Sequence, residues 1–178
     1  MNDLIIWPDQ RLKQKSEPIP ESMFGEELDK LFNKMELTMK KYRGIGISAI
    51  QIGIPLQAMI VTNVENGKLY KMVNPVIEKE TEDRKMIYTS EGCLSFPSLN
   101  VPVWRFEDCT VKFTSPSGKE ENVYIMDPLA ARCAQHEYDH LLGITMLSHL
   151  SSVALSRTKE KYSKILRKMD ISFKYEDL

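Results

Sequence analysis

The strongest constraint on the fold of this 178-residue chain is a helix that the sequence marks clearly between residues 127 and 143. Aspartate, here Asp127, is favoured at the position just before the first turn of a helix. Proline, here Pro128, fits the first helical position because a backbone N–H would have no acceptor within the helix there. A glycine closes the segment, as is typical just beyond a helix. Within it, His136 and His140 are four residues apart, so both imidazole rings lie on one helical face. The fold must present these two rings together.

The two histidines belong to the sequence HEYDH at residues 136–140, which has the HExxH pattern. Two imidazoles one helical turn apart can bind the same cation. Glu137 lies next to the first of them, where it can take a proton from a water molecule that the cation activates. The motif therefore predicts a hydrolytic metal site with Glu137 as general base. We interpret Asp139 as an exposed residue or a supporting partner of the site rather than a catalytic acid.

A catalytic site of this kind has three protein ligands and an open position, so a third ligand must come from elsewhere. Cys133 shares the helical face but lies about 7.5 Å along the axis from the midpoint of the histidines, too far for a Zn–S bond of about 2.3 Å. Met146 occupies the position of the third histidine in the metzincin pattern, which excludes that class. His149 lies past the helix and suggests a surface or capping role. Cys109 alternates with apolar residues and suggests a core position.

Cys93 and Glu160 remain as candidate third ligands. Glu160 follows His140 at a spacing close to that of a thermolysin-like glutamate ligand, but lysines flank it, which is typical of a solvated helix face. Cys93 follows a glycine in the segment SEGCLSFP, where the backbone can approach a ligand closely. The residues alone favour Cys93 and leave a metallopeptidase that uses Glu160 as the alternative. A non-catalytic protein with a structural Cys/His site is a third hypothesis, disfavoured because such a site has no use for Glu137.

Composition excludes several classes of function. The chain has 24 Lys and Arg against 25 Asp and Glu, and its net charge of −1 offers no general field for holding nucleic acid. No apolar run reaches the roughly 18 residues of a membrane-spanning helix, and the N-terminus has no visible export signal. Three cysteines, an odd number, argue against a disulfide framework. We therefore expect a cytoplasmic protein that does not bind a membrane or a specific nucleic-acid sequence.

The remaining segments predict a single α+β domain over residues 1–178, because strands lie between helices without regular βαβ alternation. An Asn-Gly pair at positions 66 and 67 is typical of a hairpin turn between two of these strands. The expected elements are amphipathic helices over residues 21–42 and 152–169, strands over 57–64, 69–78, 108–115 and 122–126, and a polar turn or exposed edge over 78–85.

Three collinear segments resemble the signatures of the peptide deformylase family. They are GIGISAIQ at residues 44–51, EGCLS at 91–95 and QHEYDH at 135–140, which match GΦGΦAAxQ, EGCΦS and QHEΦDH in order, Φ being hydrophobic. The resemblance covers most of the chain. It implies an α+β fold whose antiparallel sheets pack around a central helix with the HEYDH motif, with the N- and C-terminal helices outside. It also implies a metal-dependent hydrolase that removes the formyl group from the N-terminal formylmethionine of nascent polypeptides and releases formate.

The resemblance further implies roles for individual residues. One divalent metal per chain, Fe(II) in the cell with zinc, nickel or cobalt as substitutes, would be bound by Cys93, His136 and His140. Catalysis would use Glu137 as general base, and the Gln51 amide and the Leu94 backbone N–H as donors to the formyl oxygen. Substrate contacts would come from Ile45, Gly46, Glu91 and Gly92.

Two residues depart from the family pattern. Ser48 replaces the usual alanine, which exchanges one small residue for another. Arg132 stands one turn before His136, where bacterial relatives commonly have an aliphatic residue near the substrate pocket, so it affects the shape of the pocket rather than the reaction. The implied partner is the formylmethionyl nascent peptide, bound by a monomer. A contact with the ribosome near its exit tunnel would use a local patch such as the basic helix over residues 152–169.

Overall fold

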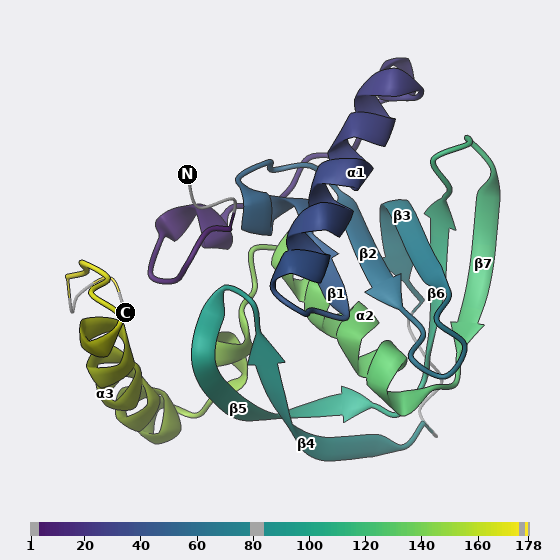
Figure 1. Cartoon of the computed structure of the whole chain (residues 1–178). Coiled ribbons are helices and arrows are strands. Elements are labelled where there is room, and N and C mark those ends of the chain that lie inside the picture. The colour runs from purple at the N-terminus through teal and green to yellow at the C-terminus, as the bar shows by residue number, and fades with distance from the viewer. Residues whose placement is uncertain (1–3, 79–83, 175–176, 178) are drawn as a thin grey trace.

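The computed structural model describes residues 4–78, 84–174 and 177. Within these residues the chain forms two antiparallel sheets and three α-helices, shown in Figure 1. The helices are α1 (Glu26–Lys41), α2 (Pro128–Leu141) and α3 (Ser152–Lys168). The first sheet has the strand order β1 (Gly46–Ser48), β2 (Ala58–Thr62), β3 (Leu69–Ile77), β6 (Cys109–Thr114) and β7 (Glu120–Ile125). The second sheet pairs β4 (Met86–Cys93) with β5 (Phe96–Phe106).

Helix α2 occupies the centre of the fold, with β1, β2 and β3 of the first sheet on one side and β5 also in contact. The side chains of β2 explain how both faces of this sheet are covered. Ile60 packs into the cluster beneath α1, whereas Met59 and Val61 pack into the cluster around α2. Successive side chains of a strand point to opposite faces, so an apolar run can be buried between two helices. The expected α+β architecture around a central helix is confirmed.

Capping residues set the ends of the helices. The Asp127 side chain accepts a hydrogen bond from the backbone N–H of Leu129 at 2.9 Å, as expected for the start of α2. The helix expected over residues 21–42 is interrupted, however. Residues Glu21–Met23 form a short 3₁₀ turn, and Gly25 follows with a φ of 104°, a backbone conformation that favours glycine. The long helix α1 therefore begins only at Glu26.

The β4–β5 hairpin brings the segment SEGCLSFP to α2. Its register is regular from the Met86–Phe106 pair to the Gly92–Asn100 pair and then shifts, so that Cys93 pairs with Phe96. This irregularity turns the end of β4 toward the histidines of the central helix. Of the polar stretch expected over residues 78–85, positions 79–83 lie outside the described residues.

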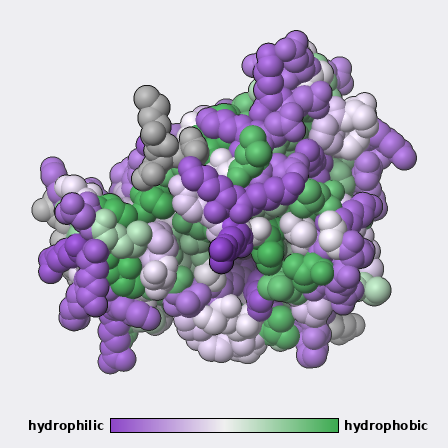
Figure 2. Space-filling view, in the orientation of Figure 1, coloured by the Kyte–Doolittle hydropathy of each residue, from purple (hydrophilic) through white to green (hydrophobic). Residues whose placement is uncertain are grey.

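Helix α3 and the N-terminal segment pack together outside the hairpin. Phe96 of β5 stacks on Trp7 with ring centroids 5.3 Å apart and contacts Tyr162 of α3 at 5.7 Å. The opposite faces of α1 and α3 are charged, and Figure 2 shows hydrophilic side chains over both helices. No described helix combines the length and the apolar character needed to cross a bilayer.

Candidate active site

Cys93, His136 and His140, the metal ligands implied by the family resemblance, lie together in the structure. The Cys93 Sγ and one ring nitrogen each of His136 and His140 are all within 4.8 Å of one another. The two histidines come from successive turns of α2, and Cys93 comes from the end of β4. One thiolate and two imidazoles are a ligand set that suits zinc and other divalent transition metals. Cys93 lies 43 positions before His136 and 47 positions before His140 in the chain, yet the three residues form one compact donor cluster.

The polar atoms of this cluster fit a bound cation. His136 Nε2 is buried and has no hydrogen-bond partner among the described residues, and His140 Nε2 lies 3.3 Å from Cys93 Sγ. A buried polar atom without a partner is rare, because its lost hydration is not compensated. Both rings are almost fully buried. The unpaired His136 nitrogen and the adjacent thiol are therefore explained if a metal ion is bound between them.

Glu91 holds the ring of His136 in one orientation. Its Oε2 lies 3.0 Å from His136 Nδ1, and its carboxylate is bound by Arg105 at 2.8 Å and 3.1 Å. Although burial alone would raise the pKa of Glu91, the hydrogen bonds from His136 and Arg105 lower it to about 2. The ionised carboxylate accepts a hydrogen bond from Nδ1–H, which leaves the lone pair of the neutral ring on Nε2 for a metal. Glu91 therefore acts on the site through His136.

Arg105 extends this network from the site to the molecular surface. Its Nη1 donates to Asp139 Oδ2 at 2.6 Å, and the same oxygen lies 2.7 Å from His149 Nε2. Arg105 occupies an inward position of β5, in line with Val101 and Val103, and is almost fully buried. Asp139 therefore supports the site, as expected. His149 contacts Asp139, in agreement with its interpretation as a residue outside the ligand set.

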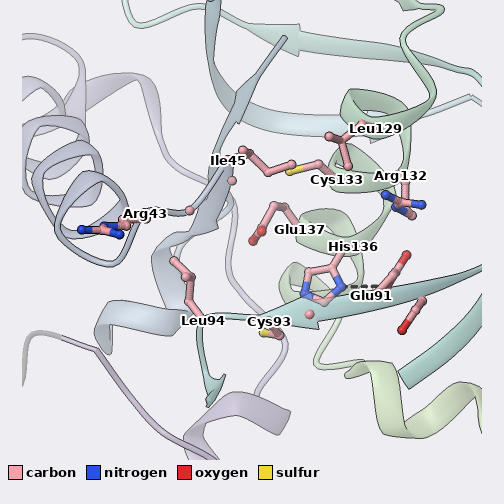
Figure 3. Close-up of a pocket in the computed structure, with 14 residues that line it drawn as sticks. Arg43, Ile45, Glu91, Cys93, Leu94, Leu129, Arg132, Cys133, His136 and Glu137 are labelled. Carbon is pink, nitrogen blue, oxygen red and sulfur yellow. Dashed lines mark hydrogen bonds and ion pairs between the residues drawn. The ribbon is translucent and has the colours of Figure 1, made fainter. Parts of the chain in front are cut away.

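Glu137 has the environment of a general base. Its Oε2 is buried without a partner among the described residues, and Figure 3 shows the carboxylate pointing into the cavity between the sheets. Burial raises the pKa of Glu137 to about 7, with the charge of His136 opposing that shift. Gly46 explains how β1 lies so close to this carboxylate. A methyl group at that position would collide with Cys133 Sγ and Glu137 Oε1, so only glycine allows this packing.

Gln51 and Leu94 flank the thiol of Cys93. The Gln51 side chain is buried in a 3₁₀ turn, Ala49–Ile52, and its Nε2 lies 3.5 Å from Cys93 Sγ. Its Oε1 accepts a hydrogen bond from the Ser48 backbone N–H at 2.9 Å, which fixes the amide with its nitrogen toward the cluster. Leu94 follows Cys93 directly and lines the cavity. Both residues are close enough to the cluster to contact a small group bound there.

A cavity of about 330 Å³ opens beside the cluster. Figure 3 shows Ile45, Leu129 and Cys133 at one end and Leu94 at the other, with Glu137 and His136 between them. Residues of both sheets form the walls, since the Ile45–Gly46 segment and the Ser90–Cys93 segment both line the cavity. Arg132 also lines it and donates from Nη1 to Thr89 Oγ1 at 2.9 Å. The predicted substrate contacts therefore share one cavity with the cluster.

Comparisons with known proteins agree with this geometry. The sequence model described as polypeptide deformylase matches residues 1–156. Peptide deformylases of Wolinella succinogenes and Aquifex aeolicus are 34% and 35% identical to the chain, over 94% of it in both cases and over 96% and 98% of their own lengths. A crystal structure of a peptide deformylase from Legionella pneumophila superposes with a TM-score of 0.84 at 32% identity, covering 96% of this chain and 98% of that one.

The chain belongs to the polypeptide deformylase family. Its activity is the metal-dependent hydrolysis that removes the formyl group from formylmethionyl peptides, which confirms the expectation from the three sequence segments. The alternative of a thermolysin-like peptidase is not favoured. Glu160 lies on the exposed face of α3, where it pairs with Lys164 at 3.0 Å.

Cys109 has the core position expected from the sequence, and Cys133 lies outside the donor cluster. Cys109 is fully buried in β6, within the cluster that packs on α2. Cys133 is buried in the wall of the cavity, where burial raises the pKa of its thiol well above the ordinary value and favours the neutral form. Both therefore differ from Cys93, which faces the histidines.

Arg105 is the residue of this enzyme's site that sequence reasoning missed. The alternation of Val101, Val103 and Arg105 along one strand places the arginine on the buried face, and a buried arginine needs an acidic partner. Glu91 in the neighbouring strand was such a partner. What the sequence does not contain is the pairing register of β4 with β5, which brings the two charges together across the sheet.

Proposed function

We propose that this enzyme removes the formyl group with one divalent cation held by Cys93, His136 and His140. The observation that supports this most directly is the compact cluster of three donors, in which the buried Nε2 of His136 has no hydrogen-bond partner among the described residues. A cation held by these three residues would supply Lewis-acid chemistry, because it would polarise the formyl carbonyl and lower the pKa of a bound water molecule. We propose Fe(II) as the physiological metal and zinc, nickel or cobalt as substitutes, since mixed thiolate and imidazole ligands suit all of these ions.

Glu137 moves the proton in this proposal. Its carboxylate takes a proton from the attacking water and then donates it to the leaving amine, so that the C–N bond breaks and formate is released. A pKa of about 7, raised by burial, suits a group that must accept and release a proton near neutrality. The unpaired Oε2 supports this role because it is free to accept that proton.

Two donors stabilise the negative charge that develops on the formyl oxygen. They are the Gln51 side-chain amide, whose nitrogen lies 3.5 Å from the Cys93 thiol, and the backbone N–H of Leu94, which follows Cys93 in the chain. The fixed Gln51 amide supports the proposal, because a donor that is already oriented needs no reorganisation during the reaction. Glu91 contributes by orienting His136.

The peptide binds as an added strand between the two sheets. Among the described strands, β1 pairs with β2 alone and so has one unpaired edge, and Ile45 and Gly46 at this strand line the cavity. The Glu91–Gly92 backbone lines the opposite wall. An extended peptide gains main-chain hydrogen bonds at a sheet edge, whatever its side chains. This mode of binding fits an enzyme that processes nascent chains of many sequences.

We further propose that residues 1–178 form one catalytic domain that acts in the cytoplasm as a monomer. A contact with the ribosome is supported by the exposed cations of α3, which are Arg157, Lys161, Lys164, Arg167 and Lys168. A cluster of this kind attracts a polyanionic surface even when the net charge of the whole chain is close to zero.

The deciding experiment is formate release from a formylmethionyl peptide by protein purified without oxygen, with bound metal measured in the same sample. We expect formate in proportion to metal content. Protein that contains one metal per chain but releases no formate would contradict the proposal and return attention to a peptidase activity.

A further inference from the structure

The apolar end of the cavity contains one cationic side chain, Arg132. Leu129, Arg132 and His136 follow each other at three- and four-residue steps, so they share the face of α2 that lines the cavity. Arg132 is half-buried, and Figure 3 shows it beside Leu129 and Cys133. A hydrophobic pocket for a side chain therefore has a guanidinium group in its wall.

Arg132 is held in place by one hydrogen bond and has further N–H groups that can donate to a ligand. Its Nη1 donates to Thr89 Oγ1 at 2.9 Å, and none of its other N–H groups donates to a described residue. Arg132 forms no ion pair with a carboxylate of a described residue, and Glu91, which lines the same cavity, pairs with Arg105 instead. A guanidinium that is fixed on one side and unpaired on the other is a donor site for a ligand.

The position of Arg132 relative to the cluster decides which part of the substrate it meets. The Cα of the first residue is two bonds of about 1.33 Å and 1.46 Å from the formyl carbon, so that residue begins close to the reacting centre. Arg132 precedes His136 by four residues, which is about 6 Å along the helix axis. A side chain of methionine length directed along α2 toward Leu129 therefore brings its outer atoms level with Arg132.

We propose that Arg132, anchored by Thr89, makes this pocket selective for a first residue whose side chain has a hydrogen-bond acceptor near its end, so that formylmethionine sulfoxide is a substrate. The proposal rests on the deformylase function above. The thioether of methionine is a weak acceptor, whereas a sulfoxide oxygen is polar. Norleucine, which has a methylene in place of the sulfur, covers the free N–H groups of Arg132 but has no hydrogen-bond acceptor for them.

The size of the effect follows from the value of one charge-assisted hydrogen bond. Such a bond corresponds to about tenfold to hundredfold in affinity or kcat/KM when the competing ligand leaves the charged donor covered. We expect the order sulfoxide, methionine, norleucine, with the first preferred to the last by at least about tenfold.

The test measures kcat/KM for three peptides, formyl-Met-Ala-Ser, its norleucine analogue and its sulfoxide analogue. In the Arg132→Leu variant we expect the preference for sulfoxide over norleucine to disappear. Thr89→Val removes the hydroxyl that accepts the hydrogen bond from Arg132 but keeps the shape of the side chain, and it should reduce the preference for sulfoxide over norleucine. Lys30→Leu is the matched control, because it removes an exposed cation on α1 away from the cavity and should leave the preference unchanged.

Binding without turnover provides the second measurement. The three formyl peptides are titrated calorimetrically into the Glu137→Ala variant and into the Glu137→Ala, Arg132→Leu double variant. We expect the affinities for the single variant to follow the order sulfoxide, methionine, norleucine, and the affinities for the double variant to show no preference for the sulfoxide. A preference that persists after Arg132→Leu, or equal affinities for all three peptides in the parent, would overturn the proposal. Absence of formate from every peptide would instead contradict the deformylase function, while the affinities would still decide the role of Arg132.

Discussion

Replacing Arg105 by methionine should destabilise this enzyme strongly, although the residue touches neither substrate nor metal. The side chains of Arg105 and Glu91 are only 5% and 3% exposed, and two hydrogen bonds join them. Arg105→Met leaves the Glu91 carboxylate buried with His136 as its remaining partner. Removing one partner of a buried ion pair destabilises a protein by about 3–5 kcal/mol, because the other charge stays out of water without compensation.

This change is a large part of the free energy of unfolding, which is about 5–15 kcal/mol for an ordinary domain. For a chain of this length, each kcal/mol shifts the melting temperature by about 2–4 °C, so Arg105→Met should melt about 6–20 °C lower. The assay is urea and thermal unfolding of parent and variant at matched metal content. Lys164→Met is the control. Its ion pair with Glu160 is 66% and 65% exposed, and losing it should change stability by no more than about 0.5 kcal/mol.

A double variant separates the buried charge from the loss of packing. Glu91→Gln together with Arg105→Met removes both charges of the buried pair and keeps an amide beside His136, while Asp139 keeps its contact with His149 in both variants. We expect it to be more stable than Arg105→Met alone by about 2 kcal/mol or more. The reasoning would be refuted if the losses in the free energy of unfolding caused by Glu91→Gln and by Arg105→Met were additive in the double variant. Additive losses would mean that Glu91 and Arg105 stabilise the fold independently.

Other substitutions test the site directly. Cys93→Ala should lose bound metal, measured by elemental analysis, whereas Glu160→Ala should retain it; the opposite pattern would exclude the ligand set. Glu137→Ala should keep its metal and lose formate release by several orders of magnitude, and full activity would exclude the general base. Gly46→Ala should destabilise the fold by about 1–3 kcal/mol in urea unfolding, because its methyl group collides with Cys133 and Glu137. Unchanged stability there would contradict the packing of β1 on α2.

The sequence predicted the parts of the site that depend on local rules. His136 and His140 share a helical face because of their spacing, and Asp127 caps the helix as its residue type favours. The break before α1 at Gly25 was missed, because hydrophobic periodicity alone does not report a positive φ. Cys93 was favoured over Glu160 only modestly by residue chemistry, and it was the three collinear segments that resembled a known family which made it the expected ligand.

The sequence contains three cysteines and three histidines. The four-residue spacing of His136 and His140 by itself determined that one helical face can bind a metal. Tertiary structure decided what completes it. The register of β4 against β5 places Arg105 beside Glu91, and the shift at Gly92 turns Cys93 toward the histidines. Neither arrangement follows from local propensity, because strand pairing depends on contacts between segments that are distant in the chain.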